Sequence, residues 1–410
     1  MKTNLYSREL LKEINPFIKR KEAIIIRGTR RVGKTSLLKL LAKELLRQGI
    51  KQENIYFFDL ENIGIREDFN NDPKNILKYI ENNRSKQYIF IDEIQYLDHP
   101  SNFIKLLVDH HPNLKIFVTG SSSLDIKKKI QDSLVGRAFY FHLYPLDFFE
   151  FLRFKKVKYP KEPTANQSKR LSSLLEEYLL FGAMPEVVLE RNLGVKKEIL
   201  ANYTNLYVAK DIRNLTEIEN ISAFNNLIKI LAGQTGNLLD KTEISNTLNT
   251  AFNTTNRYLD ILQYTYIALL LKPYFANLRA KLTKTPKIYF YDLGLRNSLL
   301  NDFNPVDFRV DRGALFENFI LLQLLRKFKQ QDIFFYRNNV GNEIDFIIDK
   351  NKTALEVKFK KMKDGRVFRV FDTFSKFDNY VLNLTLNKQA ANYRFIDWWH
   401  FLNSLMGDKG

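Results

Sequence analysis

The sequence AIIIRGTRRVGKTS, residues 23–36, joins an apolar strand pattern to a phosphate-binding loop and to the first residues of a helix. From Gly28 to Ser36 it fits G-x-x-x-x-G-K-[ST], and a strand before it with a helix after it is the context in which that pattern binds phosphate. Glycines let backbone N–H groups approach one phosphate, and the helix N-terminus adds partial positive charge. The residues predicted to bind a nucleotide are Gly28, Arg31, Gly33, Lys34, Thr35, Ser36 and, from a later strand, Asp92.

Apolar runs and helical stretches alternate through the first 147 residues. The runs cover residues 23–28, 54–61, 87–93, 115–121 and 138–146, and the helical stretches cover residues 34–48, 73–83, 102–110 and 124–130. Three of the runs carry Ile, Val or Phe at nearly every position, which is typical of strands covered on both faces. The alternation therefore predicts a parallel α/β sheet.

Two acidic residues follow the run YIFI and complete the predicted nucleotide chemistry. Lys34 is expected to reach the β- and γ-phosphates of ATP, and Thr35 to place its hydroxyl on Mg²⁺. Asp92, at the end of its strand, would bind the Mg²⁺ shell through water. Glu93 would orient and polarise the attacking water.

Two further positions are predicted to contact the γ-phosphate. In KIFVTGSSSLD we choose Ser121, with Thr119 behind it, although these Ser and Gly residues could also simply cap the next helix. Arg137 precedes the last apolar run, and it could reach the γ-phosphate of a neighbouring subunit. The alternative for Arg137 is a surface arginine near the sheet edge.

Helical patterns replace strands after residue 148. FFEFLRF, LSSLLEEYLLFGAMPEVVLE and EILANYTNLYVAKDIRNL read as helices. Residues 240–249 and 254–264 then resemble a helix–turn–helix, with TYIALLLKPYF as a wing strand and one more strand in KIYFYDLG. The second of these helices carries Arg257 and could enter a DNA major groove, or the unit could pack or bind protein instead.

Acidic residues and one lysine gather in the C-terminal part. Glu317 lies on the helix RGALFENFILL, Asp345 in EIDFIID, and Glu356 and Lys358 in LEVKF, with Glu343 as a spare acidic residue. A strand period of two places Glu356 and Lys358 on one face, where Asp345 of a neighbouring strand can join them. Such carboxylates can hold a divalent metal that activates water, while the lysine orients the hydroxide. The same cluster could also only bind, or be solvated.

The spacing D-x10-E-x-K on two strands resembles the PD-(D/E)XK nucleases, which implies a metal on Asp345 and Glu356 with Glu317 and Lys358 beside it. Basic residues follow the lysine, interleaved with phenylalanines, and suit a surface that binds a nucleic-acid backbone. These residues are Lys360, Lys361, Lys363, Arg366 and Arg369, with Phe359, Phe368 and Phe371.

The nucleotide motifs, in this order, resemble the AAA+ ATPases. The segments GR…LYPLDFFEFL and YLLFGAMPEVV are similar to the prokaryotic AAA+ branch that carries a C-terminal nuclease-like domain of uncharacterised function. This resemblance implies a five-stranded α/β core in residues 1–147 and a helical lid in 148–215. The helix–turn–helix pattern predicts a winged-helix-like segment in 216–300, and the resemblance to the PD-(D/E)XK nucleases implies a restriction-endonuclease-like α/β domain in 301–410. No lid arginine stands in a fixed motif, and Arg191 and Arg213 are the candidates.

The amino-acid composition indicates which class of partner the protein binds. The 410 residues include 64 Lys and Arg against 46 Asp and Glu, a formal net charge of +18, which attracts polyanions and most often nucleic acid. Cysteine is absent, and no apolar run reaches the ~18 residues of a membrane span. Composition and the nucleotide motifs together lead us to expect a cytoplasmic protein that uses ATP and Mg²⁺ and binds DNA. Because Arg137 would act on a neighbouring subunit, we also expect a homo-oligomer. The alternative is a nucleotide-dependent scaffold or signalling switch with a protein partner.

Overall fold

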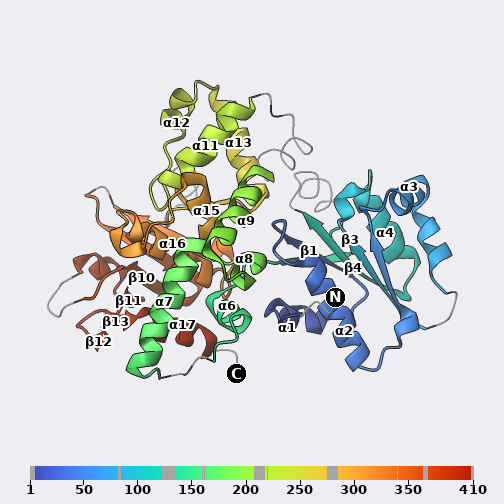
Figure 1. Ribbon diagram of the computed structural model, residues 1–410, viewed down its shortest axis with the longest axis horizontal. Helices are drawn as coiled ribbons and strands as arrows, with labels where there is room; N and C mark the ends of the chain where they lie inside the picture. The colour runs from blue at the N-terminus through green and yellow to red at the C-terminus, as the bar shows by residue number, and fades with distance from the viewer. Residues whose placement is uncertain are drawn as a thin grey trace.

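The computed structural model describes residues 5–81, 85–121, 134–158, 160, 162–206, 218, 220–274, 285–338, 340–362 and 368–407. Figure 1 shows a blue N-terminal part built around one sheet and a second part that holds all the later helices and strands. The segment containing α6 (Phe148–Phe154) and α8 (Pro185–Leu189) lies where the two parts meet.

The N-terminal part is the parallel five-stranded sheet that the sequence predicted. Its strand order is β2-β3-β4-β1-β5, and every neighbouring pair is parallel. Ile24 and Ile26 of β1 face a cluster that contains Leu37 and Leu41, whereas Ile25 faces the opposite cluster. The strands are β1 (Ala23–Gly28), β2 (Ile55–Asp59), β3 (Gln87–Asp92), β4 (Leu114–Ser121) and β5 (Ala138–His142), and the helices are α1 (Leu10–Ile14), α2 (Lys34–Arg47), α3 (Ile63–Asn71) and α4 (Pro100–His110).

Four details of this part differ from the prediction or lie beyond it. The helix expected at residues 73–83 is a 3-10 helix, Pro73–Tyr79, and α3 before it was not predicted. The last strand ends at His142 rather than at residue 146. The helix expected at residues 124–130 lies outside the described residues.

A single apolar cluster runs through the second part, from Leu146 to Leu402. Within it Phe148 of α6 packs edge-on against Phe319 and Trp398, with ring centroids 5.7 and 5.4 Å apart. The segments predicted as lid, winged helix and C-terminal domain therefore share one core. The described helices before the C-terminal domain are α6, α7 (Ala165–Phe181), α8, α9 (Leu193–Leu206), α11 (Ile221–Gly233), α12 (Lys241–Thr247), α13 (Phe252–Tyr264) and α15 (Leu293–Leu300).

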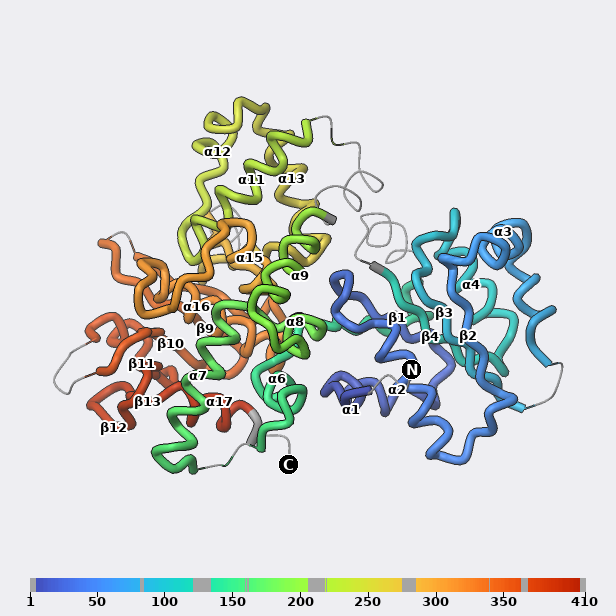
Figure 2. Tube along the Cα trace, in the orientation of Figure 1, coloured from blue at the N-terminus to red at the C-terminus, as the bar shows by residue number. Residues whose placement is uncertain are grey.

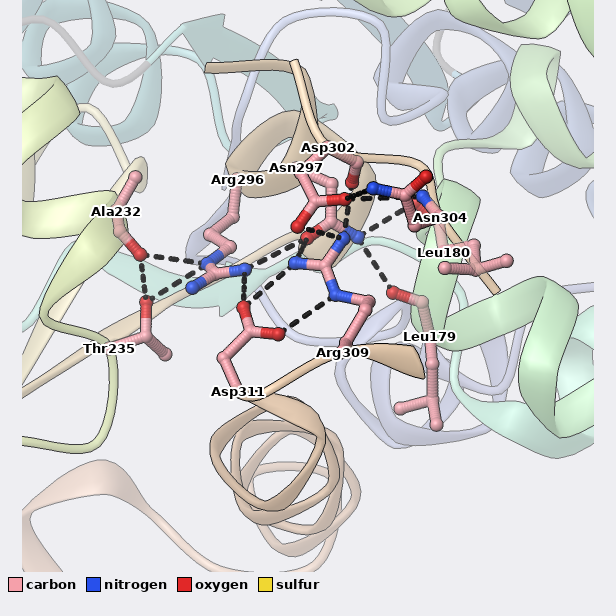
Figure 3. Close-up of polar contacts among 10 residues, drawn as sticks. All are labelled: Leu179, Leu180, Ala232, Thr235, Arg296, Asn297, Asp302, Asn304, Arg309 and Asp311. Atoms are coloured by element: carbon pink, nitrogen blue, oxygen red, sulfur yellow. Dashed lines mark hydrogen bonds and ion pairs between the residues drawn. The ribbon is translucent and has the colours of Figure 1, made fainter. Parts of the chain in front are cut away.

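Strand β6 (Ala268–Leu271) follows α13 and pairs antiparallel with β7 (Lys287–Phe290), so that three helices precede a two-stranded sheet. A buried polar cluster then joins this unit to the C-terminal domain (Figure 3). Arg296 of α15 donates to Ala232 O at 2.8 Å and also pairs with Asp311, to which Arg309 donates at 2.7 Å. Asn297 donates to Leu179 O and Leu180 O, both at 2.9 Å, and so ties α15 to the end of α7.

The C-terminal domain contains a mixed six-stranded sheet of order β12-β13-β11-β10-β9-β8. Strand β10 runs parallel to β11 and antiparallel to β9. The helix predicted around Glu317 and the strands predicted around Asp345 and Glu356 are present, whereas β12, β13 and the last helix were not predicted. The elements are α16 (Arg312–Leu324), β8 (Ile333–Arg337), β9 (Glu343–Ile348), β10 (Thr353–Val357), β11 (Asp378–Asn383), β12 (Lys388–Gln389), β13 (Arg394–Asp397) and α17 (Trp398–Gly407).

The predicted basic and aromatic surface after Lys358 does not form as expected. Phe371 is fully buried and Phe368 nearly so, and both belong to an apolar cluster of the C-terminal domain. Phe359 packs against Phe316, with ring centroids 5.2 Å apart. Lys360, Lys361 and Arg369 are exposed, whereas Lys363 and Arg366 lie outside the described residues. These rings are part of the fold rather than a stacking platform for bases.

Across the described part of the chain, no helix combines the length and the apolar character that crossing a membrane requires.

Candidate nucleotide-binding site

The phosphate-binding loop connects β1 to α2. A Cβ at Gly28 would lie 2.3 Å from Leu143 O, so only glycine fits where β1 meets the segment after β5. Gly33 caps α2 with a left-handed φ of 98°, a conformation that glycine adopts without strain. The Lys34 Nζ atom lies over this loop and donates to Gly28 O at 3.3 Å and to Thr29 O at 3.0 Å. The loop therefore holds the ammonium group of Lys34 beside the N-terminus of α2, where a phosphate group would bind.

Four predicted site residues, Lys34, Thr35, Asp92 and Glu93, meet at the ends of β3 and β4, together with Thr119, which was predicted to lie behind Ser121. Thr35 Oγ1 donates to Asp92 Oδ2 at 2.5 Å, and Thr119 Oγ1 donates to the other oxygen of Asp92. The Glu93 N–H donates to Thr119 Oγ1 at 3.1 Å, and the Glu93 carboxylate lies 3.9 Å from Lys34 Nζ. Glu93 has a φ of 56°, a left-handed conformation that is uncommon for non-glycine residues.

Thr119 provides a hydroxyl to this group. It is fully buried in β4, next to β3, and it contacts both acidic positions of the site. The side chain of Ser121 lies outside the described residues, so its predicted contact stays a prediction. A strand period of two places Thr119 and Ser121 on the same face of β4.

These residues fit ATP with a divalent cation. The loop amides and Lys34 suit phosphate oxygens, and the Thr35 hydroxyl and Asp92 carboxylate are the oxygen donors that Mg²⁺ prefers. Mg²⁺ commonly keeps several waters and needs few protein ligands, so two donors are sufficient. When bound, the cation would neutralise charge on the β- and γ-phosphates.

Three predicted residues of the site have other surroundings. Arg31 donates to Glu186 of α8 at 3.1 Å and lies over the Tyr203 ring, so its guanidinium faces the helices rather than the phosphate position. Ser36 is exposed on the first turn of α2. Arg137 lies at the start of β5, where its carbonyl accepts from Ala23 N at 2.8 Å.

Because β5 is parallel to β1, Arg137 lies at the N-terminal end of these strands, whereas Gly28 and the phosphate-binding loop lie at their C-terminal end. Its guanidinium donates to Asp109 at 2.7 Å instead. Arg137 therefore does not contribute to the site of its own subunit. Of the two lid candidates, Arg191 makes no hydrogen bond or ion pair with the loop among the described residues. Arg213 lies outside the described residues.

A buried ionic network behind the loop was not predicted. Arg8 donates from Nη1 to Val32 O in the loop at 2.9 Å and from Nε to Glu150 of α6 at 3.0 Å. Arg326, just after α16, also contacts Glu150, at 3.3 Å. Burial alone would raise the pKa of the Glu150 carboxyl, but Arg8 and Arg326 lower this pKa to about 2. The network connects the loop to the C-terminal domain through charged side chains, and no local motif identifies it.

The C-terminal acidic residues do come together, but lysines neutralise them. Lys287 of β7 donates to Glu317 at 3.0 Å, pairs with Glu343 and lies 3.7 Å from Asp345. The part that Lys287 takes in this cluster was not predicted. Lys358 pairs in the same way with Glu356 and lies 4.0 Å from Asp345.

Further contacts close this acidic cluster. The second Asp345 oxygen accepts from Val357 N at 2.7 Å, and Tyr289 donates to Glu317 at 2.5 Å. Burial and Asp345 raise the pKa of Glu356 to about 8, and burial together with Asp345 raises that of Glu317 to about 7. Within the described ranges, no group of three or more Asp, Glu or His side chains is placed to hold a metal ion. The predicted residues are thus adjacent, yet they form ion pairs rather than an open ligand set.

Comparison with known families divides the chain into three segments. Residues 20–152 match the family described as AAA domain. Residues 172–305 and 312–404 match two families described as domains of unknown function, DUF8612 and DUF4143. The first match covers the loop, Asp92, Glu93 and Thr119, and together with the parallel sheet it supports a P-loop AAA ATPase core.

Similar solved structures include Cdc6p from Pyrobaculum aerophilum, at 11% identity and a TM-score of 0.32, covering 73% of this chain and 96% of that one. A DNA clamp loader delta protein of Bacillus subtilis is 15% identical with a TM-score of 0.26, covering 77% of this chain and 99% of that one. Because both TM-scores are below 0.5, the fold assignment rests on the sheet order and the family match.

Two uncharacterized proteins are similar over most of their length. One from Haemophilus influenzae is 28% identical over 345 residues, covering 82% of this chain and 81% of that protein. One from Methanocaldococcus jannaschii is 32% identical over 346 residues, covering 82% of this chain and 74% of that protein. The chain therefore belongs to the same family as this Methanocaldococcus jannaschii protein, and its N-terminal part carries the AAA domain.

Proposed function

We propose that this protein binds and hydrolyses ATP with Mg²⁺ and uses the cycle to control nucleic-acid binding by its second part. One observation carries the ATPase half: the hydrogen bonds that join Thr35, Asp92, Thr119 and Glu93 beside Lys34. A nucleotide-binding loop alone could serve only as a switch, but a positioned carboxylate next to it is what hydrolysis requires.

The side chains of this chain have separable roles in that reaction. Lys34 compensates phosphate charge, and Thr35 with Asp92 supplies the oxygens for the cation. Glu93, whose side chain is 18% exposed, can accept a hydrogen bond from the attacking water and take its proton. Thr119 holds the backbone N–H of Glu93 and the carboxylate of Asp92, so it orients both acidic residues at once.

The net charge of +18 supports nucleic acid as the partner. The lysine-paired acidic cluster favours a C-terminal domain that binds without cutting, because ion pairs with Lys287 already compensate the charge of Glu317 and Glu343. A protein partner is the second candidate, and the same neutralised cluster fits it, since a binding domain needs no catalytic metal.

The test is the rate of ATP hydrolysis with and without duplex and single-stranded DNA at about 50 and 200 mM salt. Stimulation at low salt, with DNA affinity dropping about 10³-fold or more at high salt, supports the nucleic-acid half, because six to ten phosphate contacts release that many counterions. The Lys34→Ala protein should show no turnover, while Lys39→Ala, an exposed position on the same helix, should behave as wild type. ATP hydrolysis at a rate that does not change when DNA is added would favour the protein partner instead.

A further inference from the structure

A cavity of about 950 Å³ lies between the edge strand β5, the α13–β6 segment and the chain after α16. Its lining includes Arg27 of β1, Tyr140 and His142 of β5, Tyr266 after α13 and Tyr291 after β7. Lys34, Thr35, Asp92 and Glu93 do not line it. The cavity is therefore distinct from the candidate ATP site, although Arg27 directly precedes Gly28.

Arg27 is a buried cation with two guanidinium nitrogens that lack a hydrogen-bond partner in the described structure. Its side chain is 3% exposed, and its Nε and Nη2 atoms have no hydrogen-bond partner among the described residues. Its guanidinium lies over the Tyr140 ring, 4.2 Å from the centroid, but an aromatic face does not satisfy the N–H groups. Burial lowers the pKa of Arg27, and no carboxylate opposes this effect. Such a charge is unfavourable unless an anion pairs with it.

The rest of the lining is cationic and aromatic. Lys272, Lys327 and Lys329 line the cavity with Arg27 and Arg326, and Glu13 is the one acidic residue among the described lining residues. The charge of Arg326 is compensated by Glu150, so Arg27 and the three lysines determine the net positive charge of the cavity wall. This balance disfavours a cationic ligand and favours one with at least one phosphate.

Flat side chains and neutral donors form the other walls. The rings of Tyr144 and Tyr291 are stacked with centroids 5.7 Å apart, and Tyr266 hydrogen-bonds His142 at 2.7 Å. Gln263 and Gln330 add amide groups that can read a base edge. The volume is that of a site for a drug-sized molecule and is far larger than a single phosphate ion needs.

We propose that this cavity is a second ligand site, which binds a nucleoside monophosphate unit with its phosphate at Arg27 and its base against the tyrosines. The unit can come from a free nucleotide or from the end of a nucleic-acid strand, because the two share this chemistry. The site lies one residue before the phosphate-binding loop, so its occupant would contact the same strand that positions Gly28.

Calorimetric titration of the Lys34→Ala protein tests this proposal, since that variant removes ATP-site binding of the probes. The probes are 5′-GMP, guanosine, inorganic phosphate and a 5′-phosphorylated deoxythymidine trinucleotide. We expect GMP or the trinucleotide to bind at least 10-fold more tightly than guanosine or phosphate. Stronger binding of GMP would identify the free nucleotide as the source, and stronger binding of the trinucleotide would identify the strand.

Arg27→Met, added to the same protein, should weaken that binding at least 10-fold. The substitution removes an unpaired buried charge, so it should leave the melting temperature unchanged or raise it. Arg20→Met is the matched control, because Arg20 also lies over an aromatic ring of β5, Phe139 at 5.2 Å, but is paired with Glu22 at the surface. Equal binding by the Arg27→Met protein, equal binding of phosphate and GMP, or no binding of any probe at millimolar concentration would overturn the proposal.

Discussion

Arg8 and Glu150, 142 positions apart in the chain, form a buried ion pair with Nε and Oε1 3.0 Å apart. Through its other nitrogens Arg8 also donates to Val32 O of the phosphate-binding loop and to Tyr144 O. The N-terminal segment that carries Arg8 leads into α1, which lies beside the junction of the two parts in Figure 2. A movement of the loop on nucleotide binding would therefore act directly on α6 and, through Glu150, on Arg326 of the C-terminal domain.

The Arg8→Met substitution tests this network. Removing one partner leaves the Glu150 charge less compensated, so the free energy of unfolding should fall by about 3 kcal/mol. The folded-state pKa of Glu150, about 2, lies below its unfolded value of about 4.3, so its stabilisation is full above pH ~4.3 and is lost as the pH falls toward 2. Arg8→Met should shift acid unfolding, followed by circular dichroism, to higher pH. An unchanged acid midpoint would contradict the role of Arg8, and Arg8→Met/Glu150→Gln should recover part of the loss.

Glu93→Gln should retain ATP binding and lose about 10²- to 10⁴-fold in hydrolysis, because an amide keeps the shape of the carboxylate but cannot accept the proton of water. Binding of a fluorescent ATP analogue and the steady-state turnover rate separate the two effects. Glu44→Gln, on the far end of α2, is the control with the same chemical change. Wild-type turnover in the Glu93→Gln protein would remove Glu93 from the mechanism.

Arg137→Ala should spare ATP affinity and lower hydrolysis about 10³-fold or more if the guanidinium acts on a neighbouring subunit. Mixing it with Glu93→Gln protein should restore some activity, since one interface of a mixed assembly then holds both intact groups. The exposed pair with Asp109 contributes little to stability, so Asp109→Asn serves as the control that breaks the pair and keeps the arginine. If mixing restores nothing and ATP affinity drops, Arg137 does not act across an interface.

Glu356→Gln should stabilise the protein at pH 8. Burial and Asp345 raise the folded-state pKa of Glu356 to about 8, above an unfolded value of about 4.3, so the wild type loses stability as the pH rises between these values. Chemical denaturation should show a gain of about 1–3 kcal/mol at pH 8 and none at pH 4. Glu343→Gln, at a more exposed member of the cluster, should gain less. A loss of stability at pH 8, or stabilisation of the wild type by Mg²⁺ that Glu356→Gln abolishes, would instead indicate a metal site.

Much of the ATP site could be predicted from the sequence because its parts are local. The loop needs glycines at fixed spacing beside Lys34 and Thr35, and Asp92 with Glu93 directly ends an apolar strand, so a few consecutive residues define each part. The parallel sheet followed from apolar runs that alternate with helical stretches. The acidic cluster was also visible in outline, because Asp345, Glu356 and Lys358 lie on neighbouring strands whose side-chain period is two.

Only the tertiary structure decided which partners these residues meet. Thr119 contacts Asp92 because β4 pairs with β3, and Arg137 lies far from the loop because the first residues of parallel strands lie at the same end of the sheet. Lys287 reaches the acidic cluster from a strand about 60 residues before Asp345 in the sequence and pairs with its carboxylates. Such long-range pairings depend on packing that no short pattern encodes, whereas a phosphate-binding loop is determined by its own backbone.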